Sequence, residues 1–253
     1  MSSIQAHVSA DEWSARVELA ACYRLVHRYG MTDLVYNHIS SRIPGTEHLL
    51  INAYGYLYDE IRASNLIKID LEGNIVGDHA DPHGYGLNQA GIVIHTAVHK
   101  ARADVGCVIH THTRAGMAVS AQAEGLLPLT QTAMRFYGHL GYHDYEGPAL
   151  DLQEQARLVA DLGQHDAMIL RNHGLLAAGP SVAEAFNTLY WLEMACKAQI
   201  DALAGGRQLC LPAEPVRLKT AHMYQPQTRG PFGLREWPAM LRQLDRLDPS
   251  YRE

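Results

Sequence analysis

The sequence predicts a single layered domain of the α/β or α+β class. Short apolar stretches typical of strands come in pairs joined by turns, and longer stretches with helical periodicity stand between them. The 253 residues, of which 47% are hydrophobic, can bury one sizeable core. We therefore expect one domain over 1–253, with residues 207–253 as a C-terminal tail that packs on it.

The first half of the chain predicts helices, hairpins and a loop. Ser9 and Glu12 form a capping box at the start of a helix, and Asn88 can cap another. Turn residues divide the strands between them. The expected elements are a helix over 9–30, strands over 32–45 and 48–55 that form a hairpin, a second hairpin over 66–77, a loop over 79–88 and a helix over 88–104.

The second half predicts a strand, a mixed segment, a strand-turn-strand unit and three longer helices. Ser181 and Glu184 form a second capping box, which opens the longest helix. Scattered prolines and charges beyond Gly206 indicate a tail that wraps the surface. The expected elements are a strand over 105–112, a helix over 114–122, a mixed segment with a short helix and strand over 126–147, a helix over 150–164, the strand-turn-strand over 166–179 and a helix over 181–206.

Composition excludes several classes of function. The net charge of -6 and pI near 6.2 leave no basic stripe for nucleic acid. Four cysteines without C-x-x-C spacing favour a reducing, cytoplasmic setting. No stretch approaches the ~20 apolar residues that span a bilayer, so we expect no membrane partner. No P-loop or G-x-G-x-x-G motif follows a strand, which gives no support to nucleotide binding.

His110 and His112, in the stretch "CVIHTH", are the first candidates for a metal site. Alternate residues of a strand point to one face, so these two imidazoles stand on the same side and could hold one cation between them. The alternative is that they are two polar residues where a strand meets water.

Other histidines could complete such a site. His173 lies in the turn of "ILRNHGLL", from which it can project into a cleft, although a turn residue chosen for local hydrogen bonding would look the same. His95 and His99 stand at helical i, i+4 spacing. Because "HTAVH" lacks the glutamate of H-E-x-x-H, we interpret these two mainly as helix-surface or supporting residues.

The ordered set of "YNHISSR", "LLINAYG", "IKID", "HKARADVGCVIHTHT" and "ILRNHGLLAAG" followed by V-x-E-A-F resembles the class II aldolase/adducin-domain family over about residues 12–205. The resemblance implies a three-layer αβα sandwich with a mainly antiparallel central sheet. It also implies a homo-oligomer, with a tetramer favoured, whose active sites lie at subunit contacts.

In the enzymes of that family, the H-x-H pair and the later N-H-G histidine bind a divalent metal, which implies His110, His112 and His173 here. One ion per subunit is expected, zinc first, with manganese or iron(II) as alternatives. Asn37 matches a substrate-contacting asparagine, and Gly55 a glycine of the phosphate pocket. The catalytic glutamate is missing, because Gln89, Ala90 and Gly91 occupy the helix start where it would stand, as in the adducin-like branch.

The substrate is expected to be a small or aromatic carboxylic acid rather than a sugar phosphate, because Tyr54 replaces a phosphate-pocket threonine. Arg114 and Arg135 could meet its carboxylate through a bidentate fork, unless they form surface ion pairs. Gln89 is a further candidate substrate contact. Tyr137, Tyr145 and His95 are candidate proton donors, although the aromatic segment that contains the tyrosines would also suit a subunit interface.

The expected activity is that of a divalent-metal-dependent carbon-carbon lyase acting on a hydroxy or keto acid. Decarboxylation is placed slightly ahead of retro-aldol cleavage, because its bond-breaking step needs no base and tolerates the lost glutamate. One alternative is a non-haem iron oxygenase on the same fold. Another is a non-catalytic, adducin-like interaction domain.

Overall fold

A seven-stranded sheet forms the centre of the computed structural model, which describes residues 4–77, 84–148 and 151–253. The strand order is β3-β2-β1-β4-β7-β6-β5. All neighbouring strands are antiparallel except β5 and β6, which are parallel, so the predicted mainly antiparallel sheet is confirmed. The strands are β1 (His38–Arg42), β2 (Leu49–Asn52), β3 (Leu66–Ile69), β4 (Cys107–Thr111), β5 (Gly141–His143), β6 (Ala167–Leu170) and β7 (Gly174–Gly179).

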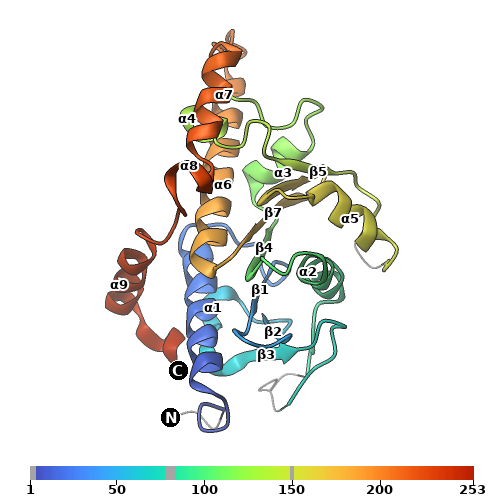
Figure 1. The fold of residues 1–253 in the computed structure, drawn as a ribbon, viewed down its shortest axis with the longest axis vertical. Helices are drawn as coiled ribbons and strands as arrows, with labels where there is room; N and C mark the ends of the chain where they lie inside the picture. Colours follow the sequence, from blue (N-terminus) through green and yellow to red (C-terminus); the bar gives the residue numbers. More distant parts are fainter. Residues whose placement is uncertain (1–3, 78–83, 149–150) are drawn as a thin grey trace.

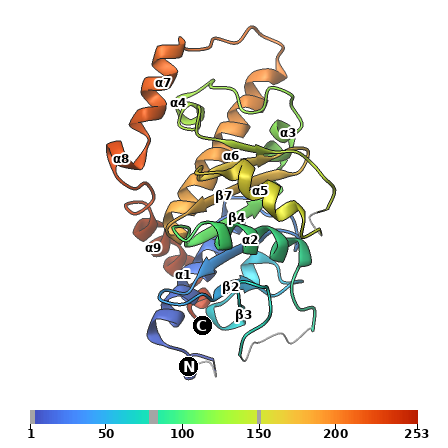
Figure 2. The same ribbon diagram turned by 45° about the vertical axis from the view of Figure 1, so that its right-hand side comes forward.

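Helices cover both faces of this sheet, which makes the predicted three-layer αβα sandwich. One face carries α1 (Ala10–Arg28), α3 (Arg114–Ser120) and α6 (Val182–Ala204), and the other carries α2 (Gln89–Ala101) and α5 (Glu154–Leu162) (Figures 1 and 2). Alternate residues of β4 enter the two cores: Ile109 packs in the core beneath α1 and α6, and Val108 in the core beneath α2 and α5. His110 stands two residues after Val108, so its side chain points to the same face of the sheet, the face that α2 covers.

The caps expected from the sequence start three helices. Ser9 accepts a hydrogen bond from the backbone N–H of Glu12 (3.1 Å), and Ser181 does the same for Glu184 (3.3 Å). Asn88 accepts from the N–H of Ala90 (3.1 Å), which fixes the start of α2 beside the sheet. The hairpin over 66–77 is shorter than expected, because its return strand forms only an isolated bridge from Ile75 to Ile69.

The C-terminal residues contain helices that the sequence did not predict. They are α7 (Glu214–Met223), α8 (Pro226–Arg229), α9 (Trp237–Leu247) and the 3-10 helix η3 (Pro249–Arg252). Prolines in the first turns of these helices are compatible with them, because no partner exists there for the missing N–H. Both α9 and η3 lie against α1, and the buried indole of Trp237 donates to Glu18.

Three further short elements complete the described chain: α4 (Gln131–Met134) and the 3-10 helices η1 (Tyr58–Glu60) and η2 (Ala63–Asn65). The expected loop over 79–88 falls partly outside the described residues. Within the part of the chain that the structure describes, no helix has the length and apolar character needed to cross a membrane.

Candidate metal centre

Two neighbouring strands bring three histidines to one edge of the sheet. His110 lies near the end of β4, His112 directly follows that strand, and His173 stands in the turn between β6 and β7. Since β7 pairs antiparallel with β4, with Thr111 opposite Leu175, this turn lies beside the end of β4. Pairing of β4 with β7 thus brings His173 beside His112, although about sixty residues separate them in the sequence.

The turn that presents His173 has demanding local geometry. Asn172 adopts a left-handed backbone conformation (φ 54°), which asparagine tolerates better than most residues. A Cβ on Gly174 would lie 2.3 Å from the backbone oxygen of Thr111. The Asn-His-Gly sequence is therefore what lets the turn approach β4 closely enough to place His173 beside the other two histidines.

The three imidazoles meet through their Nε2 atoms. The Nε2 of His112 lies 2.8 Å from that of His110 and 2.9 Å from that of His173. Among the described residues, these three form the one group of three or more histidine, cysteine or acidic side chains close enough to share a metal ion, with all candidate ligand atoms within 4.8 Å of one another.

The opposite nitrogens of two rings have fixed acceptors. The Nδ1–H of His110 donates to the backbone carbonyl of Leu175 (2.9 Å), and that of His112 to the carboxylate of Asp33 (3.0 Å). Each neutral ring then carries a lone pair on Nε2, and two such lone pairs cannot satisfy one another. A cation between them relieves this conflict, and such partners of the distal nitrogen are typical of histidine metal ligands.

Burial keeps two of these ligands, His110 and His173, neutral. It lowers the pKa of His110 well below its ordinary value, with the neighbouring His173 and His38 contributing. It also lowers the pKa of His173 to about 4, with a contribution from His112. Neutral imidazoles at neutral pH are the form that binds metal, so the residues present fit a divalent ion such as zinc.

A cavity of about 370 Å³ opens beside the triad. Its wall includes Tyr145, whose ring centroid lies 6.3 Å from that of His173. The volume suits a small organic acid. The residues that line it are Asp33, Tyr36, His38, Tyr54, Asn88, Ala90, Ile94, His110, His112, Tyr145, Pro148 and His173.

The other candidate substrate contacts differ in their exposure and in their position relative to the cavity. Asn37 is buried, and neither polar atom of its side chain has a hydrogen-bond partner among the described residues. Gly55 has a positive φ of 93°, and the ring of Tyr85 occupies the space of a Cβ. Gln89 and Arg114 are exposed and do not line the cavity. Their roles stay predictions.

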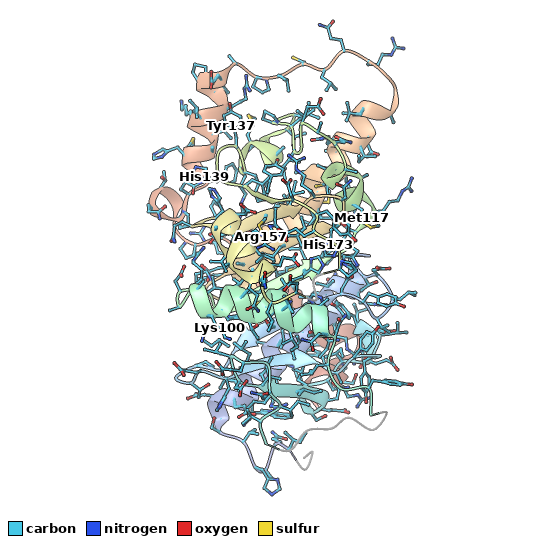
Figure 3. The ribbon with its side chains drawn as sticks, turned by 90° about the vertical axis from the view of Figure 1, so that its right-hand side faces the viewer. Lys100, Met117, Tyr137, His139, Arg157 and His173 are labelled. Carbon is cyan, nitrogen blue, oxygen red and sulfur yellow. The ribbon has the colours of Figure 1, made fainter. Side chains whose placement is uncertain are left out.

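Arg135 and Tyr137 lie elsewhere within one chain. The guanidinium of Arg135 donates to Asn187 (2.8 Å), stacks over Phe232 at 4.9 Å and borders a cavity formed with the C-terminal segment. Tyr137 borders yet another cavity, and it lies with His139 toward one end of the molecule, away from His173 (Figure 3). Neither residue reaches the triad of its own chain.

His95 and His99 differ from the interpretation as surface residues. Both are buried, because the face of α2 that carries them packs against β1. His95 contacts His38 rather than the cavity, so as a proton donor it would have to act through another group. The sequence reasoning missed His38, Ser40 and Asp33; the i, i+2 spacing in "NHISS" was the available signal for the first two.

Comparisons with known proteins agree on a family. Residues 17–200 match the model described as Class II Aldolase and Adducin N-terminal domain. The crystal structure of an aldolase II superfamily protein from Pseudomonas syringae superposes with a TM-score of 0.92 and 50% identity, covering all of both chains. L-fuculose 1-phosphate aldolase from Glaciozyma antarctica PI12 has a TM-score of 0.83 and 26% identity, covering 96% of this chain and 94% of that one.

Alpha-adducin of Rattus norvegicus is also similar, with 40% identity over 246 residues. The match covers 92% of this chain but 33% of the adducin. The similarity is therefore to one domain of that longer protein. Enzymes and adducins both stand among the relatives.

Proposed function

Because the chain belongs to the class II aldolase and adducin N-terminal domain family, we propose that it is a divalent-metal-dependent carbon-carbon lyase. The substrate proposed is a small or aromatic hydroxy or keto acid, and the reaction is decarboxylation or, second, retro-aldol cleavage. The single observation that carries this proposal is the convergence of three imidazoles on one point beside a cavity.

The chain's own residues would divide the work. His110, His112 and His173 would hold the ion, whose Lewis acidity would polarise a carbonyl and favour negative charge on an enolate oxygen. Leu175 and Asp33 orient two of the rings. Tyr145, in the cavity wall beside His173, is the proposed proton donor to the product.

The proposed activity can be tested with defined acids. Protein loaded with zinc or manganese is incubated with a panel of 2-hydroxy and 2-keto acids, alkyl and aryl, and release of carbon dioxide or of a new carbonyl compound is measured. The expected result is turnover of at least one acid, lost in His173→Ala. Oxygen uptake with iron(II) instead would favour the oxygenase, and no product from a metal-loaded protein would contradict the lyase.

A non-catalytic interaction domain is the second candidate, and the similarity to alpha-adducin favours it. The converging triad argues against it, because a pure scaffold has no need of three imidazole nitrogens gathered at one point. The two candidates differ in metal binding. A parent protein that takes up no metal would make the interaction domain the better account.

A homo-oligomer, with a tetramer favoured, is proposed as well. Arg135 and Tyr137 do not reach the triad of their own chain, so their predicted roles require that they lie near the triad of a second copy. Light scattering coupled to size-exclusion chromatography measures the mass. A monomer would contradict both the oligomer and these two roles.

A further inference from the structure

A fourth histidine lies beside the triad without belonging to it. His38 begins β1 and pairs with His110 across the antiparallel strands. The two ring centroids are 5.0 Å apart, and the rings are inclined at 32°. His38 lines the same cavity as the triad, yet it is not in the group of side chains whose ligand atoms converge.

Gly91 leaves the room that this imidazole occupies. Gly91 is near the start of α2, and a Cβ built on it would lie 2.9 Å from two ring atoms of His38. Any larger side chain at position 91 would have to displace that ring. The imidazole of His38 therefore fills the part of the site toward which a side chain at 91 would point.

A buried hydrogen-bond chain runs from His38 into the protein. The Nδ1 of His38 lies 2.8 Å from the Nε2 of His95; the Nδ1 of His95 bonds to the hydroxyl of Ser40, which lies 2.9 Å from the Nε2 of His99. The four side chains are at most 2% exposed. They alternate between β1 and α2, because i, i+2 residues of the strand meet i, i+4 residues of the helix.

This chain controls the tautomer of His38. Each link needs one donor and one acceptor, and a neutral imidazole that donates from one nitrogen accepts at the other, so the His38–His95 and His95–Ser40 links must point the same way. When Ser40 donates to His95, its single hydrogen is used, so His99 must donate to Ser40. With the links pointing inward, His38 presents a lone pair on Nε2; with the links pointing outward, it presents an N–H there. Burial lowers the pKa values of His38, His95 and His99, the latter two to about 3, so the rings stay neutral in either direction.

We propose that His38 is a further substrate-contacting residue, whose Nε2 hydrogen-bonds the substrate oxygen nearest the triad, and that His95, Ser40 and His99 are positioning residues that fix its tautomer and orientation. The inference rests on the proposed lyase function. Gly91 has no side chain that could make a polar contact in the cavity, and His38 on β1 would make this contact instead. No hydrogen-bond partner for this Nε2 is found among the described residues, which leaves it for a ligand.

Ligand binding to the metal-loaded protein tests the contact. Cobalt(II) replaces zinc as a spectroscopic probe, and acetohydroxamate, a small chelator with two oxygens, is titrated while the visible absorption is followed. We expect His38→Phe to weaken acetohydroxamate binding about tenfold, the upper end for one hydrogen bond. Cobalt stoichiometry should not change. The exposed His222→Phe is the matched control and should bind as the parent does.

Ser40→Ala provides a second variant with little change in volume, should His38→Phe fail to fold. In nitrogen-15 NMR spectra of the metal-loaded parent, we expect one neutral tautomer for His38. In Ser40→Ala we expect a mixture of the two neutral tautomers of His38, together with a two- to fivefold loss of acetohydroxamate affinity. If Ser40 had a purely structural role, the affinity would not change together with the tautomer.

The outcomes separate this inference from the proposed function. Failure of the parent to bind cobalt would contradict the metal-dependent lyase itself. Normal cobalt binding with equal acetohydroxamate affinity in the parent and both variants would overturn the role of His38 alone. Cobalt binding without any acetohydroxamate binding in the parent would also overturn it, because the cavity would then offer no open contact.

Discussion

Two histidine clusters lie side by side in this molecule, and they satisfy their nitrogens in opposite ways. In the triad, the distal nitrogens of His110 and His112 donate to fixed acceptors, so the lone pairs on Nε2 point at one another. In the chain of His38, His95, Ser40 and His99, donors and acceptors alternate in series. The Nε2 lone pairs of the triad need a cation, whereas the nitrogens that join the hydrogen-bond chain pair with one another without one.

Spacing alone therefore does not identify a metal site. His110 and His112 have i, i+2 spacing on a strand, as have His38 and Ser40, and His95 and His99 have the i, i+4 spacing of many helical ligand pairs. What distinguishes the triad is convergence of three atoms at a cavity. Four perturbations should act differently on the two clusters.

Metal addition should give the largest effect, and only through the triad. A free zinc concentration 1,000-fold above its dissociation constant should raise the free energy of unfolding by about 4 kcal/mol, because the ion binds the folded state. Urea unfolding with and without zinc measures this. Stabilisation that persists in a His110→Ala, His112→Ala double variant would show that the ion binds elsewhere.

Acid should lower the free energy of unfolding of the protein, because it protonates the histidines of the buried hydrogen-bond chain. Burial lowers the pKa of His95 and His99 to about 3, with contributions from His99 and from the charge of Arg42, respectively. Since both are near 6.5 when unfolded, each contributes stability that is present above pH 6.5 and is lost as the pH falls toward 3. The loss is up to about 1.4 kcal/mol per pH unit for each ring.

Unfolding in urea between pH 7 and pH 4.5, without metal, measures this dependence. His99→Gln should reduce the slope, because the substituted side chain does not titrate. The exposed His222→Gln serves as its control and should leave the slope unchanged. If the free energy of unfolding of the parent did not change across this range, His95 and His99 would not be buried in the neutral form.

A methyl group at position 91 should disturb the boundary between the clusters. Gly91→Ala places a Cβ against the ring of His38, and overpacking of this kind typically costs about 1–3 kcal/mol. Gly205→Ala is the matched control, since its nearest neighbour is 3.7 Å away on the flexible side chain of Arg207. Equal free energies of unfolding for the two variants would mean that His38 does not occupy the described position.

Loss of an orienting group should have the smallest effect. Asp33→Ala removes the acceptor for Nδ1 of His112, and we expect about tenfold weaker zinc binding. The low end of the usual range applies because the Asp33 side chain is 40% exposed and water can replace it. Competition with a chromogenic chelator measures the affinity, with the exposed Asp201→Ala as control.

Local patterns predicted much of this fold. The caps at Ser9, Asn88 and Ser181 start helices as expected, because capping depends on neighbouring residues alone. The helices α7, α8 and α9 differ from the predicted tail, because prolines are as compatible with the first turn of a helix as with irregular structure. Periodicity could not show that one face of the C-terminal segment packs on α1.

The site was predictable to the extent that its residues have local signatures. The H-x-H pair and the resemblance placed His110, His112 and His173, and strand pairing then explains how they meet. His38 escaped notice because its role depends on pairing with β4 and on the absence of a side chain at Gly91. The i, i+2 spacing of His38 and Ser40 indicates that the two side chains share one face of a strand, but it does not indicate which strand and helix lie beside that face.

We expect the metal ion to bind to the triad and not to the hydrogen-bond chain of His38, His95, Ser40 and His99. Elemental analysis of purified, untagged protein tests it in three forms: the parent, His110→Ala with His112→Ala, and His95→Gln with His99→Gln. The account predicts near one divalent ion per chain in the parent and in the His95/His99 variant, and none in the His110/His112 variant. No ion in the parent after incubation with zinc, manganese and iron(II), or an undiminished ion content without His110 and His112, would contradict it.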